Sequence, residues 1–376
     1  MLALAAILAI FVYGMIAAML GTILPDLSAK FKLSPKQNGN IALAQALGLV
    51  IASVSAGPLI DNSGYKLGLL LGLGLIAISL YLLPNSKSYG QVALFLFILG
   101  LGGGTIVTGA NSLVYDIGGK EQAAALNFLN LFFGLGGLAT PFISANLLSR
   151  NATRLCYLTA ILTSVTLVVH ATVTMPVPKS VGTISPAQVG SLLGQPALWL
   201  LSALLFLYVA CEVGVWNWLA RHLIAQGIPE SRALNILSLG FALGLLLGRV
   251  AVAPIFKTVA PETVTLAASV LMAITTYLAL QTRQPGIAWI AVFGAGIAMA
   301  PVFPTTLAIT GMVFKGTQAT AMGIVIMFGW IGLAVSSRII GAIAGEDPKR
   351  LKKALLILPA ASVLMIVVNL ALRATL

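Results

Sequence analysis

Charged side chains are scarce in this sequence. Of its 376 residues only 8% are charged, whereas 59% are hydrophobic. A soluble globular protein carries about 25% charged residues. A soluble surface with so few charges would expose large apolar patches to water, which monomers avoid. The composition therefore excludes a soluble globular protein and indicates a chain that lies mostly in lipid.

Acidic residues, cysteine and histidine are also few. Nine acidic residues stand against 21 basic ones, and the chain has two cysteines, Cys156 and Cys211, and two histidines, His170 and His222. These residues form no metal-ligand or catalytic pattern, and no phosphate-binding loop is present. We therefore expect no enzyme activity, metal, disulfide or cofactor. The basic residues lie mainly in short loops, which is typical of membrane topology rather than nucleic-acid binding.

Apolar runs fill the rest of the chain. A spanning helix needs about 20 residues, and turn-forming residues separate twelve segments of suitable length. We predict an all-α membrane protein with twelve transmembrane helices, near 2–24, 41–60, 67–83, 91–114, 123–148, 156–175, 197–220, 234–256, 264–280, 287–313, 319–344 and 354–372. The connections are short, so successive helices run antiparallel.

The chain also repeats itself. Residues 46–49 and 242–245 both read ALGL, and Pro58 and Pro254 follow them at the same offset of 196. Two more helix pairs match at offsets of 194 and 195: Gly100 and Gly102 with Gly294 and Gly296, and Gly134 with Gly329. Such repeats are typical of transporters that rock two halves against each other.

The repeat divides the chain into three parts. We predict pseudo-symmetric six-helix halves at 1–175 and 196–376, joined by a central cytoplasmic linker at 176–195. The solute of such a transporter binds between the halves near the membrane midplane.

One loop carries a family resemblance. Residues 57–66 read GPLIDNSGYK, which resembles the loop 2–3 signature of the major facilitator superfamily, with Tyr65 in place of one basic residue. The resemblance implies a cytoplasmic gate that includes Gly57, Asp61, Gly64 and Lys66. An aspartate at a helix end can accept hydrogen bonds from the N-terminus of a facing helix.

Two further charges are gate candidates. Asp116 ends the fourth predicted helix, where Lys66 or Lys120 can pair with it. Arg249 follows Gly248 in the eighth helix, in the region that corresponds to the approach to the 57–66 loop.

Finer similarity points to the fucose-permease-like branch, which carries sugars in symport. The residues are GANSLV at 109–114, FFGLG at 132–136 and YVACEVG at 208–214. Sugar–proton symporters of this branch use carboxylates in the first and fourth helices, whereas this chain has Gly21 and Val107 there. The resemblance implies a monomer in the bacterial inner membrane with both termini in the cytoplasm.

Glu212 lies close to the middle of a predicted span, where an ionisable group is costly and marks a functional candidate. Tyr208 and Trp216 lie four residues to either side and share its helix face. Aromatic rings beside an acid suit a polyol, so Glu212 is a substrate ligand and the candidate for coupling to H+ or Na+. The alternative is a structural ion pair with Arg338.

Neutral polar side chains add to this set. Asn127 and Asn130 share a helix face, and amides inside spans need hydrogen-bond partners. The complete set of substrate-binding candidates is Tyr13, Gln45, Asn111, Asn127, Asn130, Tyr208, Glu212, Trp216, Trp330 and Arg338.

The leading hypothesis is alternating-access symport of a monosaccharide with a cation. One alternative is transport of an organic anion or amphiphile, which Arg338 and basic outer loops favour, and another is a sensor or scaffold that does not transport. The proposed orientation conflicts with charge bias: of the 21 Lys and Arg, 7 fall nearest cytoplasmic loops and 14 nearest outer loops, against the positive-inside rule.

Overall fold

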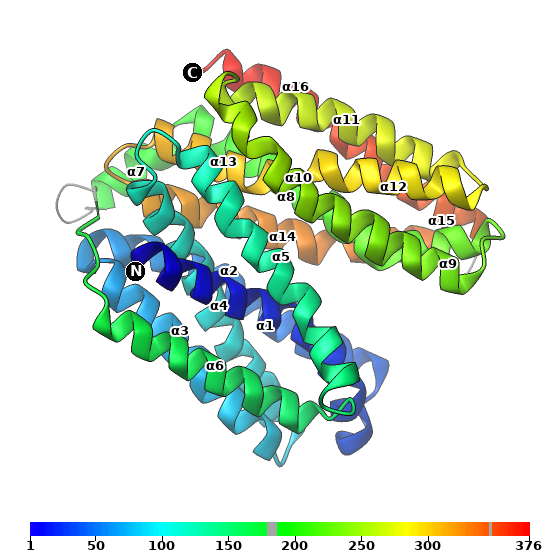
Figure 1. The fold of residues 1–376 in the computed structure, drawn as a ribbon, viewed down its shortest axis with the longest axis horizontal. Coiled ribbons are helices and arrows are strands. Elements are labelled where there is room, and N and C mark those ends of the chain that lie inside the picture. Colours follow the sequence, from blue (N-terminus) through cyan, green and yellow to red (C-terminus); the bar gives the residue numbers. More distant parts are fainter. Residues whose placement is uncertain (179–185, 346–347) are drawn as a thin grey trace. The chain divides into compact units, whose positions relative to one another are not determined.

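The chain is almost entirely helical. A computed structural model describes residues 1–178, 186–345 and 348–376, so residues 179–185 of the predicted linker lie outside the described residues. The helices are α1 (Leu2–Phe31), α2 (Pro35–Ser63), α3 (Tyr65–Leu82), η1 (Leu83–Asn85), α4 (Tyr89–Ile117), α5 (Gln122–Asn146), α6 (Ala152–Thr172), α7 (Pro186–Leu193), α8 (Pro196–Ala225), α9 (Glu230–Asn235), η2 (Ile236–Ala242), α10 (Leu243–Val252), η3 (Ala253–Lys257), α11 (Pro261–Gln281), α12 (Pro285–Met299), α13 (Val302–Val313), α14 (Gln318–Ala344), α15 (Pro348–Leu355) and α16 (Ile357–Arg373) (Figure 1).

The predicted fold class is confirmed. Within the described ranges, twelve helical stretches are long and apolar enough to cross a membrane. Several predicted spans are composite: the eighth runs through α9, η2 and α10, and the tenth is interrupted between α12 and α13 at Ala300 and Pro301. The segment η2 is a π-helix, a local widening that often marks functional sites.

Helix ends extend beyond the predicted apolar cores because polar residues cap them. Ser34 Oγ accepts from the Gln37 N–H at 3.3 Å, and Gln37 Oε1 accepts from the Ser34 N–H at 2.9 Å. This capping box satisfies two backbone donors that a helix start leaves unpaired. It starts α2 at Pro35, six residues before the predicted span.

The described chain separates into two compact units. Unit 1 contains residues 1–119, 129–189 and 314–327; unit 2 contains 120–128, 190–313 and 328–376. In unit 1, α4 packs against α2 and α3, and α3 against α6; in unit 2, α11 and α16 pack together (Figure 1). The helices α5 and α14 each contribute residues to both units. The predicted boundaries of the two halves stay a prediction.

Each unit has the same close contact between two helices. In unit 1, a Cβ at Gly48 would collide with the Phe97 carbonyl oxygen, and a Cβ at Gly100 with that of Gln45. In unit 2, a Cβ at Gly244 or Gly296 would collide with a carbonyl oxygen in the same way. Small residues allow membrane helices to approach to backbone contact.

These contacts correct part of the predicted repeat. Gly48 and Gly244 are 196 residues apart, as predicted, and Gly100 and Gly296 are also separated by 296 − 100 = 196. The offset of 194 for this helix pair was therefore wrong. A helix with several glycines can be aligned with its counterpart at more than one offset. The contacts between the helices decide which offset is correct.

The glycine contact predicts a difference between two alanine substitutions in α2. Gly48→Ala should reduce stability by roughly 1–3 kcal/mol because the added methyl overlaps backbone. Gly39→Ala should be neutral or stabilising, since a Cβ there meets nothing within 4 Å and alanine favours helix. Thermal unfolding of the purified variants in detergent measures both. Equal melting temperatures would contradict the account.

Candidate functional site

The interior acid of unit 2 lies on α8. Glu212 is half-buried, and Tyr208 and Trp216 lie one helical turn before and after it. Both side chains are neighbours of the Glu212 carboxylate, and the buried Arg249 side chain of α10 acts on it electrostatically. The Tyr208 hydroxyl is buried and makes no hydrogen bond of ordinary geometry. The cluster thus combines an acid, a cation, a phenol and an indole.

The aromatic part of this cluster has a second layer. The Trp216 ring meets the Phe241 ring edge to face, with centroids 5.1 Å apart. Phe241 belongs to the π-helical segment η2 and is fully buried, whereas Trp216 is 36% exposed. The fixed phenylalanine orients a ring whose other side stays accessible.

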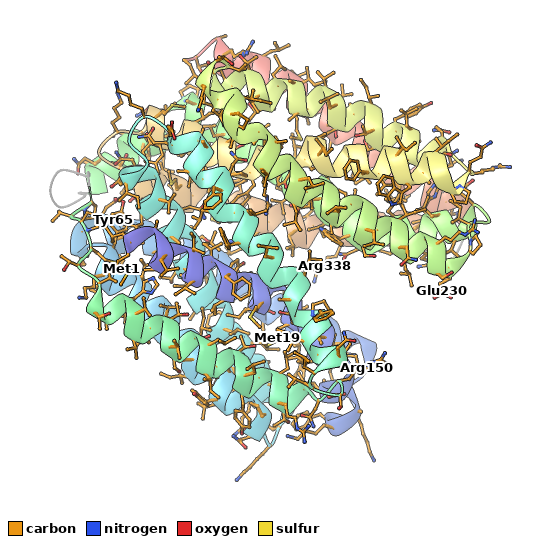
Figure 2. All side chains as sticks on the ribbon, in the orientation of Figure 1. Met1, Met19, Tyr65, Arg150, Glu230 and Arg338 are labelled. Atoms are coloured by element: carbon orange, nitrogen blue, oxygen red, sulfur yellow. The ribbon has the colours of Figure 1, made fainter. Side chains whose placement is uncertain are left out.

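Two arginines were considered as charged groups of this region, and they differ in burial. Arg338 lies on α14 and is exposed (Figure 2), whereas Arg249 is buried on α10. The ion-pair alternative with Arg338 and the gate assignment of Arg249 stay predictions.

In unit 1 the predicted aspartate contact is present. Asp61 Oδ2 accepts hydrogen bonds from the Thr320 backbone N–H at 2.9 Å and from Thr320 Oγ1 at 2.7 Å. Thr320 lies in the first turn of α14, where unpaired N–H groups and the helix dipole favour a negative charge. The expected hydrogen bond from a facing helix N-terminus is confirmed, and its role as a gate stays a prediction.

Two glycines allow this contact. A Cβ at Gly57 would overlap the backbone of Ala319 and Thr320, and a Cβ at Gly323 would overlap the Ser53 carbonyl. The helices α2 and α14 thus touch backbone to backbone beside Asp61. Gly64 ends α2 with φ 87, a conformation that favours glycine.

Asp116 bonds to Tyr65 of the 57–66 motif, and its pairing with Lys66 or Lys120 stays a prediction. Its Oδ2 accepts a hydrogen bond of 2.7 Å from the Tyr65 hydroxyl, which also contacts Ser112. Lys66 is exposed. Tyr65 is the residue that departs from the signature's basic pattern, and it replaces a cation with a buried neutral donor.

The amides of α4 and α5 bond to each other, to backbone or to a threonine hydroxyl. Asn130 Nδ2 donates to Asn111 Oδ1 at 2.8 Å, and Asn111 Nδ2 donates to the Val107 carbonyl at 2.8 Å. In unit 2, Asn127 Nδ2 donates to Thr305 Oγ1 at 3.2 Å. All three asparagines are buried. These bonds are the usual way to satisfy amides between membrane helices.

The remaining candidates are dispersed. Tyr13 is buried and stacks on Phe133 with ring centroids 5.6 Å apart. Gln45 is buried on α2, and Trp330 is half-buried on α14. Each unit therefore brings together a subset of the predicted residues.

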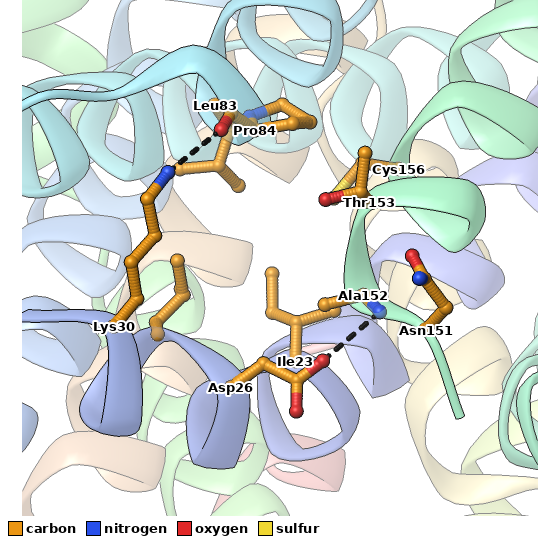
Figure 3. Close-up of a pocket in the computed structure, with 10 residues that line it drawn as sticks. Ile23, Asp26, Lys30, Leu83, Pro84, Asn151, Ala152, Thr153 and Cys156 are labelled. Carbon is orange, nitrogen blue, oxygen red and sulfur yellow. Dashed lines mark hydrogen bonds between the residues drawn. The ribbon is translucent and has the colours of Figure 1, made fainter.

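A small cavity lies at one end of α1. Its volume is ≈ 120 Å³, and Asp26, Lys30, Pro84, Asn151 and Cys156 are among its lining residues. Asp26 accepts from the Ala152 N–H at 3.1 Å and Lys30 donates to the Pro84 carbonyl at 2.9 Å (Figure 3). Ligand pockets measure about 300–1,000 Å³, so this cavity joins helix ends rather than holding a sugar-sized solute.

Several contacting residues were missed at the level of sequence. They are Tyr65, Phe241, Thr305 and Thr320. Tyr65 had a signal, because it replaces a basic residue within the 57–66 motif. A helix N-terminus such as that at Thr320 could have been expected as the partner of Asp61, because its N–H groups bind an acid. The contacts of Phe241 and Thr305 depend on tertiary packing, which no local sequence pattern shows.

Twelve apolar helical stretches in the described part of the chain, with a repeated glycine contact, define a multi-pass membrane protein. Residues 6–337 match the profile of the Major Facilitator Superfamily, and the chain belongs to this family. Both statements confirm the sequence-based assignment.

Named relatives include sugar transporters. The chain is 33% identical over 133 residues to the sodium-dependent glucose transporter 1 of Rattus norvegicus and 29% identical over 245 residues to a glucose/galactose transporter of Brucella abortus. The alignments cover 35% and 60% of this chain and 27% and 60% of those proteins. These relatives are transporters, in agreement with the prediction that the chain is not an enzyme.

Solved structures share the fold. The E. coli fucose:proton symporter FucP superposes with a TM-score of 0.83 at 18% identity, covering 98% of both chains. The human organic anion transporter MFSD10 gives a TM-score of 0.79 at 16% identity, again over 98% of each chain.

The Asp61 contact predicts a graded loss of stability. Asp61→Ala removes the acceptor of two hydrogen bonds and should lower the free energy of unfolding by roughly 1.5–3 kcal/mol. Thr320→Val removes one donor and should cost less. Ser63→Ala, an exposed change in the same helix end, is the control. Thermal unfolding in detergent ranks the three, and an Asp61→Ala variant as stable as the control would refute the contact.

Proposed function

We propose that this protein is a secondary transporter that moves a monosaccharide across the bacterial inner membrane by alternating access. Membership of the Major Facilitator Superfamily supports the transporter class. The named glucose and glucose/galactose transporters support a sugar as the solute. No part of the proposal requires a cofactor, a metal or nucleic acid, and the working unit is a monomer.

The observation that carries the sugar proposal is the Trp216 cluster. An accessible indole, held edge-on by Phe241, lies one turn from a half-buried acid near the middle of a span. Sugars present apolar C–H faces to aromatic rings and hydroxyl groups to polar side chains. Arg249 and Glu212 supply donors and acceptors of the required kind.

Trp216 therefore gives a sharp test. Purified protein in liposomes loaded with unlabelled glucose should take up labelled glucose by counterflow, and Trp216→Ala should reduce this exchange at least tenfold at low solute concentration, a loss of about 1.4 kcal/mol. Trp289→Ala is the matched control, because Trp289 is also 36% exposed and stacks on Phe293. It should exchange glucose like the wild type.

Two results would contradict the sugar proposal. Wild-type protein that exchanges no member of a panel of hexoses and pentoses, but exchanges an organic anion, would favour the anion alternative. Equal losses of glucose exchange in the Trp216→Ala and Trp289→Ala variants would show that the Trp216 cluster does not bind the sugar.

We also propose that both termini and the Asp61 contact are cytoplasmic, against the excess of basic residues in the outer loops. A cysteine at Ser34 should then react with an impermeant thiol reagent in intact cells, and a cysteine at Asn62 should not. Both positions are exposed, and the native Cys156 and Cys211 are buried, so the background is low. Reaction of the Asn62 position alone would reverse the orientation.

A further inference from the structure

The short helix α15 is basic on one side and apolar on the other. Three of its residues are buried, at a spacing that places them on one helix face: Leu351, Ala354 and Leu355. Arg350 and Lys353 are exposed, and Lys352 is half-buried. The buried face attaches α15 to unit 2 and leaves the basic residues at its surface.

This helix lies where several spans of unit 2 end. It packs against α8 and α16, and Lys352 Nζ donates a hydrogen bond of 2.8 Å to Oε1 of Gln281, the last residue of α11 (Figure 1). Two exposed arginines belong to the same helix ends. Arg283 follows the end of α11, and Arg221 lies in the last turns of α8. The ends of membrane spans lie at the level of the lipid headgroups.

Two of these cations contact neutral groups. Lys352 bonds to the amide of Gln281, and the Arg221 guanidinium lies 5.8 Å from the centroid of the Trp218 ring. An amide oxygen and an indole ring leave the positive charge uncompensated, and the ammonium and guanidinium groups keep further N–H donors. Both side chains can therefore donate to an anion.

Acidic residues do not balance the charge of this end of unit 2. Glu230, at the start of α9, is exposed, and Glu346 and Asp347 precede α15 outside the described residues. With both included, seven basic residues stand against these three acids: Arg221, Arg232, Arg283, Lys349, Arg350, Lys352 and Lys353. The excess of positive charge favours an anionic partner.

Exposed apolar side chains adjoin the basic residues on the same helix ends. Tyr277 and Leu278 are 50% and 49% exposed in the last turns of α11, on the side of Gln281 that faces the middle of the membrane. Ile224 is also exposed in the last turn of α8. A soluble anion would use only the cations, whereas an amphiphile with an anionic head uses both kinds of surface.

We propose that α15, Arg221 and Arg283 bind an anionic phospholipid. The headgroup phosphate contacts the basic side chains, and the acyl chains lie along the apolar ends of α8 and α11. Lysine and arginine near the membrane surface attract anionic lipids, and basic pockets between spans bind their headgroups. The inference depends neither on the transported solute nor on the orientation of the chain. It gives a role to basic residues that the positive-inside rule leaves unexplained.

The test measures lipid binding to the purified full chain in detergent. Short-chain phosphatidylglycerol should raise the melting temperature saturably, whereas phosphatidylcholine of the same chain length and inorganic phosphate should not. Lys352→Gln/Lys353→Gln should weaken phosphatidylglycerol binding about tenfold or more, because each basic residue near the headgroup adds to the attraction. Added salt should weaken binding to the wild type.

A matched control removes two charges elsewhere. Lys32 and Lys36 are exposed at the connection of α1 and α2 in unit 1, and Lys32→Gln/Lys36→Gln should bind phosphatidylglycerol like the wild type. If the α15 double variant does not fold, Lys353→Gln alone changes an exposed side chain and should weaken binding by a smaller factor. Native mass spectrometry of the wild type should also show phosphatidylglycerol retained in preference to phosphatidylcholine.

Several results would overturn the inference. Equal stabilisation by the two lipids, or none by phosphatidylglycerol, would show that the headgroup charge is not recognised. Stabilisation by inorganic phosphate alone would assign the basic surface to a soluble anion. Equal affinity of the α15 variant and its control would place the bound lipid elsewhere on the protein.

Discussion

The cost of placing a charge in hydrocarbon is the constraint on which this structure depends. Because they carry almost no charged residues, twelve helical stretches of the described chain are apolar enough to cross a membrane. Asp61 meets the N-terminus of α14, and Asp116 meets a tyrosine hydroxyl. These two acids lie near helix ends, whereas Glu212 lies in the middle of its helix.

Close helix packing provides the frame for these charges. Pairs of glycines bring α2 against α4 in unit 1, and α10 against α12 in unit 2, at the same offset of 196 residues. The internal repeat is therefore present in the helix contacts as well as in the amino-acid sequence. The polar residues do not follow it: position 53 is a serine on α2, whereas its counterpart at 249 is an arginine on α10. A shared scaffold thus carries different chemistry in its two copies.

Most of the fold could be predicted from sequence, because hydropathy and turn residues define membrane spans and the 57–66 loop defines the family. The Asp61 contact was also predictable, since an acid after a helix needs donors that a helix N-terminus supplies. The burial of the two arginines was not predictable. Arg249 and Arg338 both lie in apolar helices, and only the packing of α10 shows that Arg249 is the buried one. The same holds for the Asn111–Asn130 hydrogen bond, where sequence placed both amides but not their pairing.

The central claim is that the indole of Trp216 contacts the transported solute. Tryptophan fluorescence of the purified protein, recorded as glucose is added, observes this contact directly. The account predicts a saturable change in the wild type that Trp216→Phe lacks and that Trp289→Phe retains. A wild type without the change, or a change that persists in Trp216→Phe, would contradict the account.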